Sequence, residues 1–224
     1  MRREVRVGIV DSGIRARHAG VVKAAKRFRL DAELQLGQGE AEADRLGHGS
    51  AVLETICQHA PNARFCIAQV FHDRWHTTPL QIAAAMHWLI DQEVNIINLS
   101  LGVRTDRLLM RDACMRAQEA GILLCAACPA QGLPVFPASY PNVLRVTGDA
   151  RCGRGQWSWL GSAQADFGAV VSTDPRGPAG ASIACAAISG TIAALMQAGV
   201  RPHELLAHLK QHAAFVGIER KRLA

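Results

Sequence analysis

Apolar residues of this chain follow two alternating patterns. Short, almost continuous apolar runs predict β-strands that are buried on both faces. Between them lie longer segments whose apolar residues recur every three or four positions, which is typical of amphipathic helices. This alternation predicts an α/β fold of three layers, a mostly parallel sheet with helices on both faces. The predicted strands are 5–10, 64–70, 94–99, 122–127, 143–147 and 167–171, and the predicted helices begin at His48, at Pro79 and near Ser182 or cover 106–120 and 201–212.

Two polar segments interrupt this pattern. Residues 31–44 are mostly acidic and contain glycine, and residues 151–161 are rich in glycine and carry Trp157 and Trp159. The first is interpreted as a solvated loop, and the second as a loop whose tryptophans hold partly exposed apolar surface. The chain has neither an internal repeat nor a linker-like stretch, so we expect residues 1–224 to form one compact domain.

Composition narrows the classes of partner and location. An apolar content of 49% argues against disorder, and no apolar run approaches the roughly 20 residues that a membrane span needs. Without a signal-peptide core and with seven scattered cysteines, the chain is expected to be cytoplasmic, with reduced thiols. The formal charge of +6 is spread along the chain, with small clusters at 23–29 and 219–222, so no nucleic-acid partner is predicted.

Three polar residues stand at positions where side chains often carry chemistry. Asp11 follows the first predicted strand, His48 lies between two glycines at a helix start, and Ser182 opens a buried helix of small residues. Each has a structural explanation when taken alone: an Asx-turn, an incidental histidine, and a helix cap. Together they are the parts of an acyl-transfer triad, in which histidine takes the serine proton and aspartate orients the imidazole.

The motifs around these residues, in the order Asp, His, Ser, resemble those of the subtilisin-like serine peptidases, the subtilases. Asp11-Ser12-Gly13, Gly47-His48-Gly49-Ser50 and Gly180-Ala181-Ser182-Ile183-Ala184 are similar to the three motifs of that family. The resemblance implies a subtilisin-like fold. It also implies that Asp11 is the orienting residue, His48 the general base and acid, and Ser182 the nucleophile.

The same resemblance implies how substrate and oxyanion are held. Ser100-Leu101-Gly102 is similar to the family segment that pairs with an extended substrate by strand addition. The Ser182 backbone N–H would donate to the oxyanion. The family's second donor, an asparagine after the strand 122–127, is replaced by Pro129, so we expect a slow enzyme and hypothesise that Gln131 supplies the missing amide.

Smaller departures from the family pattern concern Ala186, where the serine helix of the family carries proline, and Val103, where it often has a second glycine. Val103 is expected to narrow the pocket for the residue before the scissile bond. No pro-region or calcium-site loop is recognisable, so neither a metal nor a cofactor is predicted. The combination favours a serine endopeptidase that processes a polypeptide substrate, for which one dedicated precursor protein is a candidate.

Four other interpretations stay open. A catalytically impaired subtilase fold that binds or escorts a peptide is suggested by Pro129, and an esterase would use the same triad. Cys125 and Cys128 have the spacing of a redox dithiol, although they follow a strand rather than open a helix. Pairs of histidines four residues apart can bind metal, but no nearby carboxylate is arranged as in a hydrolase site, so side chains on a helix face are the favoured explanation. These pairs are His72 with His76 and His208 with His212.

Overall fold

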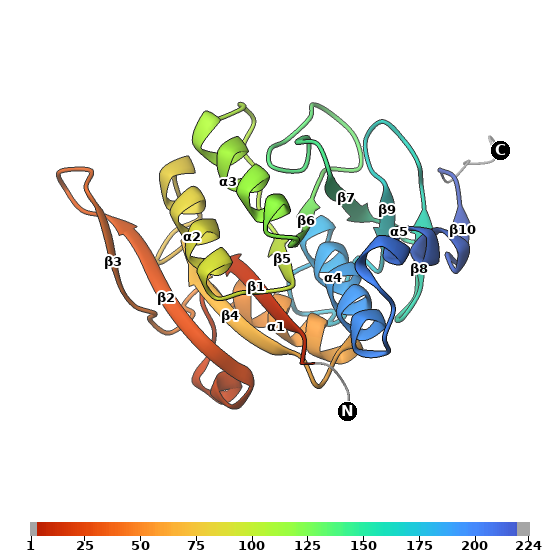
Figure 1. Cartoon of the computed structure of the whole chain (residues 1–224), viewed down its shortest axis with the longest axis horizontal. Helices are drawn as coiled ribbons and strands as arrows, with labels where there is room; N and C mark the ends of the chain where they lie inside the picture. Colours follow the sequence, from red (N-terminus) through yellow and green to blue (C-terminus); the bar gives the residue numbers. More distant parts are fainter. Residues whose placement is uncertain (1–3, 219–224) are drawn as a thin grey trace.

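A ten-stranded sheet runs through the computed structural model, which describes residues 4–218 (Figure 1). Its strand order is β10-β8-β9-β7-β6-β5-β1-β4-β2-β3, and neighbours are parallel except for the pairs β2–β3 and β8–β9. The strands are β1 (Arg6–Asp11), β2 (Val22–Leu30), β3 (Leu36–Glu40), β4 (Arg64–Gln69), β5 (Ile96–Leu99), β6 (Leu123–Ala127), β7 (Val143–Gly148), β8 (Trp157–Trp159), β9 (Phe167–Ala169) and β10 (Phe215–Val216).

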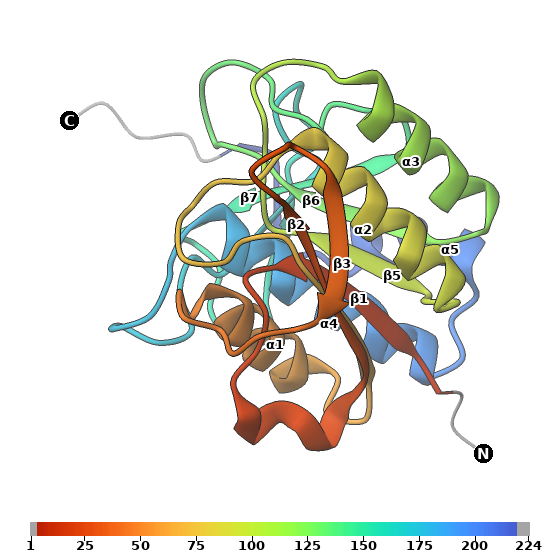
Figure 2. The ribbon, with the colours of Figure 1, turned by 90° about the vertical axis from the view of Figure 1, so that its left-hand side faces the viewer.

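Helices cover both faces of this sheet (Figures 1 and 2). One apolar cluster joins the sheet to α1, α4 and α5, and a second joins its other face to α2 and α3. The three-layer α/β architecture predicted from the sequence is therefore confirmed. The helices are α1 (His48–His59), α2 (Pro79–Asp91), α3 (Leu108–Glu119), α4 (Ala181–Gln197) and α5 (Pro202–Gln211), with a 3₁₀ turn η1 (Ala16–Val21).

The central strand β1 shows why the apolar runs become buried strands. Val7 and Ile9 pack in the cluster that contains α1 and α4, whereas Val10 packs in the cluster of α2 and α3. A Cβ added to Gly8 would lie 2.9 Å from the Leu89 side chain of α2, so this helix packs directly on the strand. Because both faces are covered, β1 needs apolar residues at successive positions.

The sequence pattern did not predict several of the strands. The predicted loop 31–44 contains β3, and the predicted loop 151–161 contains β8, so both loop predictions are wrong in part. β3 pairs with β2 at the edge of the sheet, where its five residues are exposed or half-buried and need no apolar alternation. The basic cluster at 23–29 lies on β2, and the one at 219–222 falls outside the described residues.

None of the helices described in residues 4–218 is by itself long and apolar enough to cross a membrane. The helices α4 and α5 reach that length and composition only as a pair, bent by 120° at the break between them.

The order of the strands indicates which edge of the sheet is suited to binding a ligand. β1 and β5 are neighbours, and the chain leaves β1 toward β2 on one side of the pair but leaves β5 toward β6 on the other side. In such sheets, ligands bind outside the carboxyl ends of the strands at this switch point. Asp11 ends β1, and Ser100 directly follows β5.

Candidate active site

Asp11 and His48 form a closely bonded pair at this edge. Asp11 ends β1 and is only 1% exposed, and His48 is the first residue of α1. The imidazole Nδ1 lies 2.8 Å from Asp11 Oδ1 and 2.9 Å from Oδ2. The backbone N–H of Ser12 also donates to Oδ1, at 2.8 Å. A carboxylate held in this way keeps the Nδ1 proton in place, which leaves Nε2 as the basic nitrogen.

The surroundings of His48 change its basicity in opposing directions. Burial lowers the pKa of His48, but the hydrogen bond to Asp11 and the negative charges of Asp11 and Asp44 raise it more, so the pKa lies above the ordinary value of 6.5. Both carboxylates favour the imidazolium form. The site therefore stabilises the cation that His48 becomes when it accepts a proton.

Asp44, which the sequence placed in a solvated loop, is buried and ties the aspartate motif to the histidine motif. Its Oδ1 accepts from Ser12 Oγ at 2.8 Å and from Gly47 N at 2.7 Å. Its Oδ2 accepts from the backbone N and the hydroxyl of Ser50, at 2.9 and 2.6 Å. Ser12 Oγ in turn accepts from the Gly49 N–H at 2.9 Å. An acidic residue just before a helix start was the available signal for this role.

The glycines of both motifs allow their backbones to touch. A Cβ added to Gly49 would lie 2.2 Å from the carbonyl oxygen of Gly13, which no side chain tolerates. Gly13 itself has a φ of +98°, a conformation that favours glycine. Gln69, at the end of β4, donates to the Ser12 carbonyl at 2.9 Å and accepts from Glu42 N at 2.7 Å. The close approach of Gly49 to Gly13 fixes the start of α1 against the end of β1.

Ser182 lies in the first turn of α4, preceded by Gly180 with a φ of +94°. As the second helical residue it has no carbonyl four residues earlier within the helix, so its N–H is available for an external acceptor. The Ser182 hydroxyl donates to the Ser100 carbonyl at 3.3 Å. In the described part of the chain, no hydrogen bond joins this hydroxyl to His48.

One cavity of about 500 Å³ brings most of the predicted site residues together. His48 and Ser182 line it with Ser100, Leu101 and Gly102. The remaining lining residues are mostly apolar or aromatic: Phe71, Trp75, His76, Thr77, Ile82 and Val103.

Trp75, which the sequence did not single out, lies beside the histidine. Its ring meets the His48 ring edge-on, with centroids 5.3 Å apart, and it also packs against Phe71 at 5.9 Å. Nevertheless Trp75 is 61% exposed. The exposed indole therefore gives the cavity an apolar surface beside His48.

The predicted replacement for the missing oxyanion donor is not brought to the cavity. Gln131 is exposed and is not among the residues that line the space around His48 and Ser182. The Pro129 carbonyl accepts a hydrogen bond from Gln164 Nε2 at 2.9 Å, which fixes the segment where the family has its asparagine. A role for Gln131 would require the loop that carries it to move toward bound substrate.

The competing thiol chemistry is disfavoured by the structure. All seven cysteines are unpaired. Burial raises the pKa of Cys125 to about 12 and that of Cys128 to about 11. Such thiols stay protonated and react slowly, which speaks against the redox interpretation.

The histidine pairs do not form metal sites with neighbouring carboxylates. His72 and His76 lie in the loop before α2, so their interpretation as helix-face residues is wrong; Pro79 starts the helix only after them. His208 and His212 stack at the end of α5, with ring centroids 4.1 Å apart. Among residues 4–218, no group of three or more His, Cys, Asp or Glu side chains could hold a metal ion.

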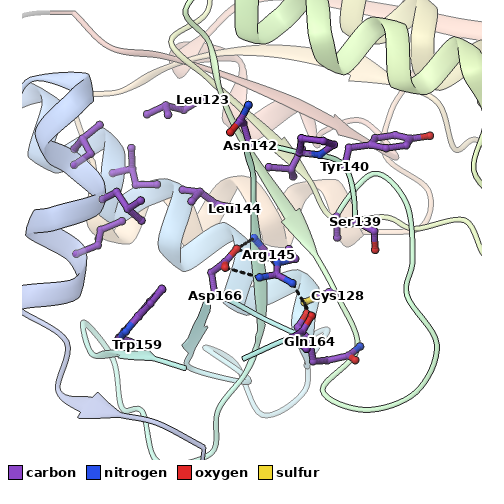
Figure 3. A pocket seen from close by; sticks show the side chains of 18 of the residues that line it. Leu123, Cys128, Ser139, Tyr140, Asn142, Leu144, Arg145, Trp159, Gln164 and Asp166 are labelled. Carbon is purple, nitrogen blue, oxygen red and sulfur yellow. Dashed lines mark hydrogen bonds and ion pairs between the residues drawn. The ribbon is translucent and has the colours of Figure 1, made fainter. Parts of the chain in front are cut away.

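A larger cavity of about 740 Å³ lies away from the triad, between the 134–142 segment, β7 and α5 (Figure 3). Arg145 pairs there with Asp166 at 2.7 Å (Figure 3), and it also donates to the carbonyl of Ala163 at 2.6 Å. The guanidinium thus closes the 162–166 turn onto β7. His48 and Ser182 do not line this cavity. Of its charged residues, Arg145 and Asp166 pair with each other, and Lys210 Nζ lies 4.3 Å from the centroid of the Trp159 ring.

The sequence of this chain matches a known protein family, because the model of the subtilase family matches residues 2–222. The chain is 37% identical over 113 residues to the subtilisin-like protease het-Q2 of Podospora anserina, covering 46% of this chain and 31% of that protein. It is 26% identical over 175 residues to subtilisin DY of Bacillus licheniformis, covering 70% and 61%. The chain thus spans about a third of the length of the first relative and about three fifths of the length of the second.

Among solved structures, the fold is similar to that of the prenylagaramide maturation protease PagA. The TM-score is 0.62, with 21% identity and coverage of 92% of this chain and 81% of that one. At this identity, the likeness concerns the fold.

Proposed function

Because the chain belongs to the subtilase family, we propose that it is a serine endopeptidase that cleaves polypeptides through an acyl-enzyme intermediate. The observation that carries this proposal is that His48, bonded to Asp11 at 2.8 and 2.9 Å, lines the same cavity as Ser182. An ion-paired histidine beside a serine at a helix start is the arrangement that activates a hydroxyl nucleophile.

The proposed first step is attack of Ser182 Oγ on the scissile carbonyl carbon. Rotation about the Ser182 side-chain bond would exchange its bond to the Ser100 carbonyl for one to His48 Nε2. His48 then takes the hydroxyl proton, and Asp11 stabilises the imidazolium. When the tetrahedral intermediate collapses, His48 gives this proton to the leaving amine. Water hydrolyses the acyl-enzyme by the same proton transfers in reverse.

The oxyanion is proposed to rest chiefly on the Ser182 N–H, at the positive end of α4. Loss of one donor typically lowers kcat by about 10² to 10³, so slow turnover is expected. Gln131 remains the proposed second donor, on the condition that its loop closes over substrate. Gln131→Ala should then slow turnover, and unchanged turnover would remove Gln131 from the site.

Substrate is proposed to pair as an extended strand with Ser100-Leu101-Gly102. Pairing cannot continue to Val103, because its N–H and carbonyl are already bonded to Phe136, both at 2.8 Å. The apolar wall formed by Phe71, Trp75 and Ile82 favours apolar substrate side chains near the scissile bond. Replacing such side chains by charged ones should lower kcat/KM.

A finer proposal concerns the biological substrate. We propose a dedicated precursor protein whose leader is removed in the cytoplasm, supported by the seven unpaired thiols and by the fold likeness to a maturation protease. In length and cysteine content the chain also resembles the maturation protease of quinohemoprotein amine dehydrogenase. A cross-linked precursor of that kind is therefore one candidate substrate.

The test is to incubate the protein with the polypeptides encoded beside it and to locate any cut by mass. The expected result is a single cut that is absent with Ser182→Ala. If no polypeptide is cut although the serine reacts with an acylating probe, the proposed precursor role is wrong and the peptidase chemistry stands.

Pro129 favours a second candidate, a subtilase fold that binds or escorts a peptide without cleaving it. Such a protein would bind its peptide equally well with Ser182→Ala, and neither form would react with a serine-directed probe. Ester turnover without any peptide cleavage would instead indicate an esterase.

A further inference from the structure

Beneath Ser182, a line of uncharged polar side chains runs between β5 and α4. Ser189 Oγ donates to Asn98 Oδ1 at 2.9 Å, and Asn98 Nδ2 donates to Ser100 Oγ at 2.9 Å. Ser100 Oγ then donates to the backbone carbonyl of Ser182 at 3.1 Å. Asn98 and Ser189 are both 0% exposed, and neither lines the cavity that contains His48 and Ser182.

This network has a defined direction. If the Asn98 amide were turned over, its oxygen would take the Ser100 proton, and Ser100 could no longer donate to Ser182. The observed orientation leaves the Ser100 hydroxyl as acceptor from Asn98 and donor to Ser182. Both polar atoms of the Asn98 side chain are therefore needed.

Polar side chains at this location are at risk of a free-energy cost, because their surroundings are buried and apolar. Asn98 lies between buried apolar residues of β5, and Ser189 lies on a helix whose neighbouring positions are buried and apolar. A buried polar group without its partner costs about 1–3 kcal/mol, whereas an apolar pair of the same shape would pack without that risk.

The network also attaches α4 to β5 at two points. Ser182 and Ser189 are about two turns apart, so they lie on the same side of the helix. Bonds at both positions fix the rotation of α4 and its position along its axis. Ser182 is held twice, because its hydroxyl donates to the Ser100 carbonyl at 3.3 Å while its own carbonyl accepts from the Ser100 hydroxyl.

We propose that Asn98 and Ser189 are positioning residues: through the Ser100 hydroxyl they set the place of the Ser182 nucleophile and its N–H relative to His48. This inference rests on the proposed peptidase function. A displacement of about 1 Å can lower the rate of an aligned reaction about 10²-fold, so loss of the network should act on the chemical step rather than on substrate binding.

The test compares Ser189→Ala with Thr191→Ala in labelling by a fluorophosphonate. Thr191 is the matched control, because it lies on the same helix and its hydroxyl donates to the Ala187 carbonyl of that helix at 2.9 Å. Ser189→Ala should lower the limiting labelling rate about 10- to 100-fold with little change in the concentration for half-maximal rate. Thr191→Ala should label at close to the wild-type rate.

A double variant separates positioning from stability. In Asn98→Leu with Ser189→Ala, no buried amide is left unpaired, so the melting temperature should return toward the wild-type value while labelling stays slow. Recovery of the labelling rate together with stability would overturn the proposal, as would equal rates for Ser189→Ala and Thr191→Ala. If the wild-type protein is not labelled at Ser182, the proposed function fails first and the positioning role falls with it.

Discussion

At the scale of single residues, the site depends on how two carboxylates hold one imidazole. Asp11 bonds to His48 directly, and Asp44 fixes the backbone on both sides of it through Ser12, Gly47 and Ser50. One carboxylate sets the charge and tautomer of His48, and the other sets its position.

The raised pKa of His48 predicts the pH dependence of activity. Attack on substrate needs the neutral imidazole, so kcat/KM should fall as the pH drops through the raised pKa, with the acid limb above pH 6.5. Asp11→Asn removes the main charge that raises this pKa, so it should move the limb to lower pH and reduce the rate by about 10⁴. A limb that stays in place in Asp11→Asn would contradict the assignment.

The same shift has the opposite sign for stability. Because the folded pKa of His48 is raised, its contribution to stability is fully present below pH 6.5 and is lost as the pH rises through the folded pKa. Melting temperatures of the wild-type protein and His48→Gln, measured across this range, should converge as the pH increases.

Asp44→Asn tests the second carboxylate. An asparagine can accept at one oxygen only, so two of the four donors around Asp44 lose their acceptor, and we expect a loss of about 2–4 kcal/mol in unfolding free energy. The labelling rate of Ser182 should fall as well, because His48 loses its support. Asp31→Asn, at an exposed turn, is the control and should change neither quantity.

At the scale of elements, the sequence pattern revealed what is buried and missed what is paired only at an edge. β1 and α4 were visible because their burial requires apolar residues at many positions. β3 was not visible, because backbone hydrogen bonds to β2 hold it and its side chains stay largely in water. Asp11, His48 and Ser182 were found through local motifs, whereas Trp75 and Asp44 act through contacts that only the folded chain creates.

The crossing of α1 and α4 gives a test at this scale. A Cβ added to Gly190 would lie 2.9 Å from the Ile56 carbonyl and 2.9 Å from the His59 Cβ, so the helices that carry His48 and Ser182 would have to separate. Gly190→Ala should destabilise the protein by about 1–3 kcal/mol and slow Ser182 labelling. Gly20→Ala has open space around it and should leave both unchanged.

At the scale of the whole molecule, the sheet brings distant segments to one edge. The start of α1, the segments after β4 and β5 and the start of α4 meet around the cavity of about 500 Å³, and Asp11 at the end of β1 bonds to His48 in its wall. The larger cavity near α5 contains none of the triad residues. The candidate site therefore lies at the switch point of the sheet and not in the larger cavity.

The prediction that no metal is bound can be tested on the whole protein. Because no cluster of three ligand-type side chains lies among residues 4–218, treatment with a strong chelator should leave the melting temperature and the labelling rate of Ser182 unchanged. A drop in melting temperature that added calcium reverses would show that a stabilising ion binds.

The most direct measurement is to react the protein with a fluorophosphonate and to map the modified peptide by mass spectrometry. The account predicts a single adduct on Ser182, formed slowly, accelerated as His48 becomes neutral, and lost in Ser182→Ala and His48→Ala although both variants remain folded. Wild-type protein that is folded yet unmodified, or an adduct on another residue, would contradict the assignment of Asp11, His48 and Ser182 as a working triad.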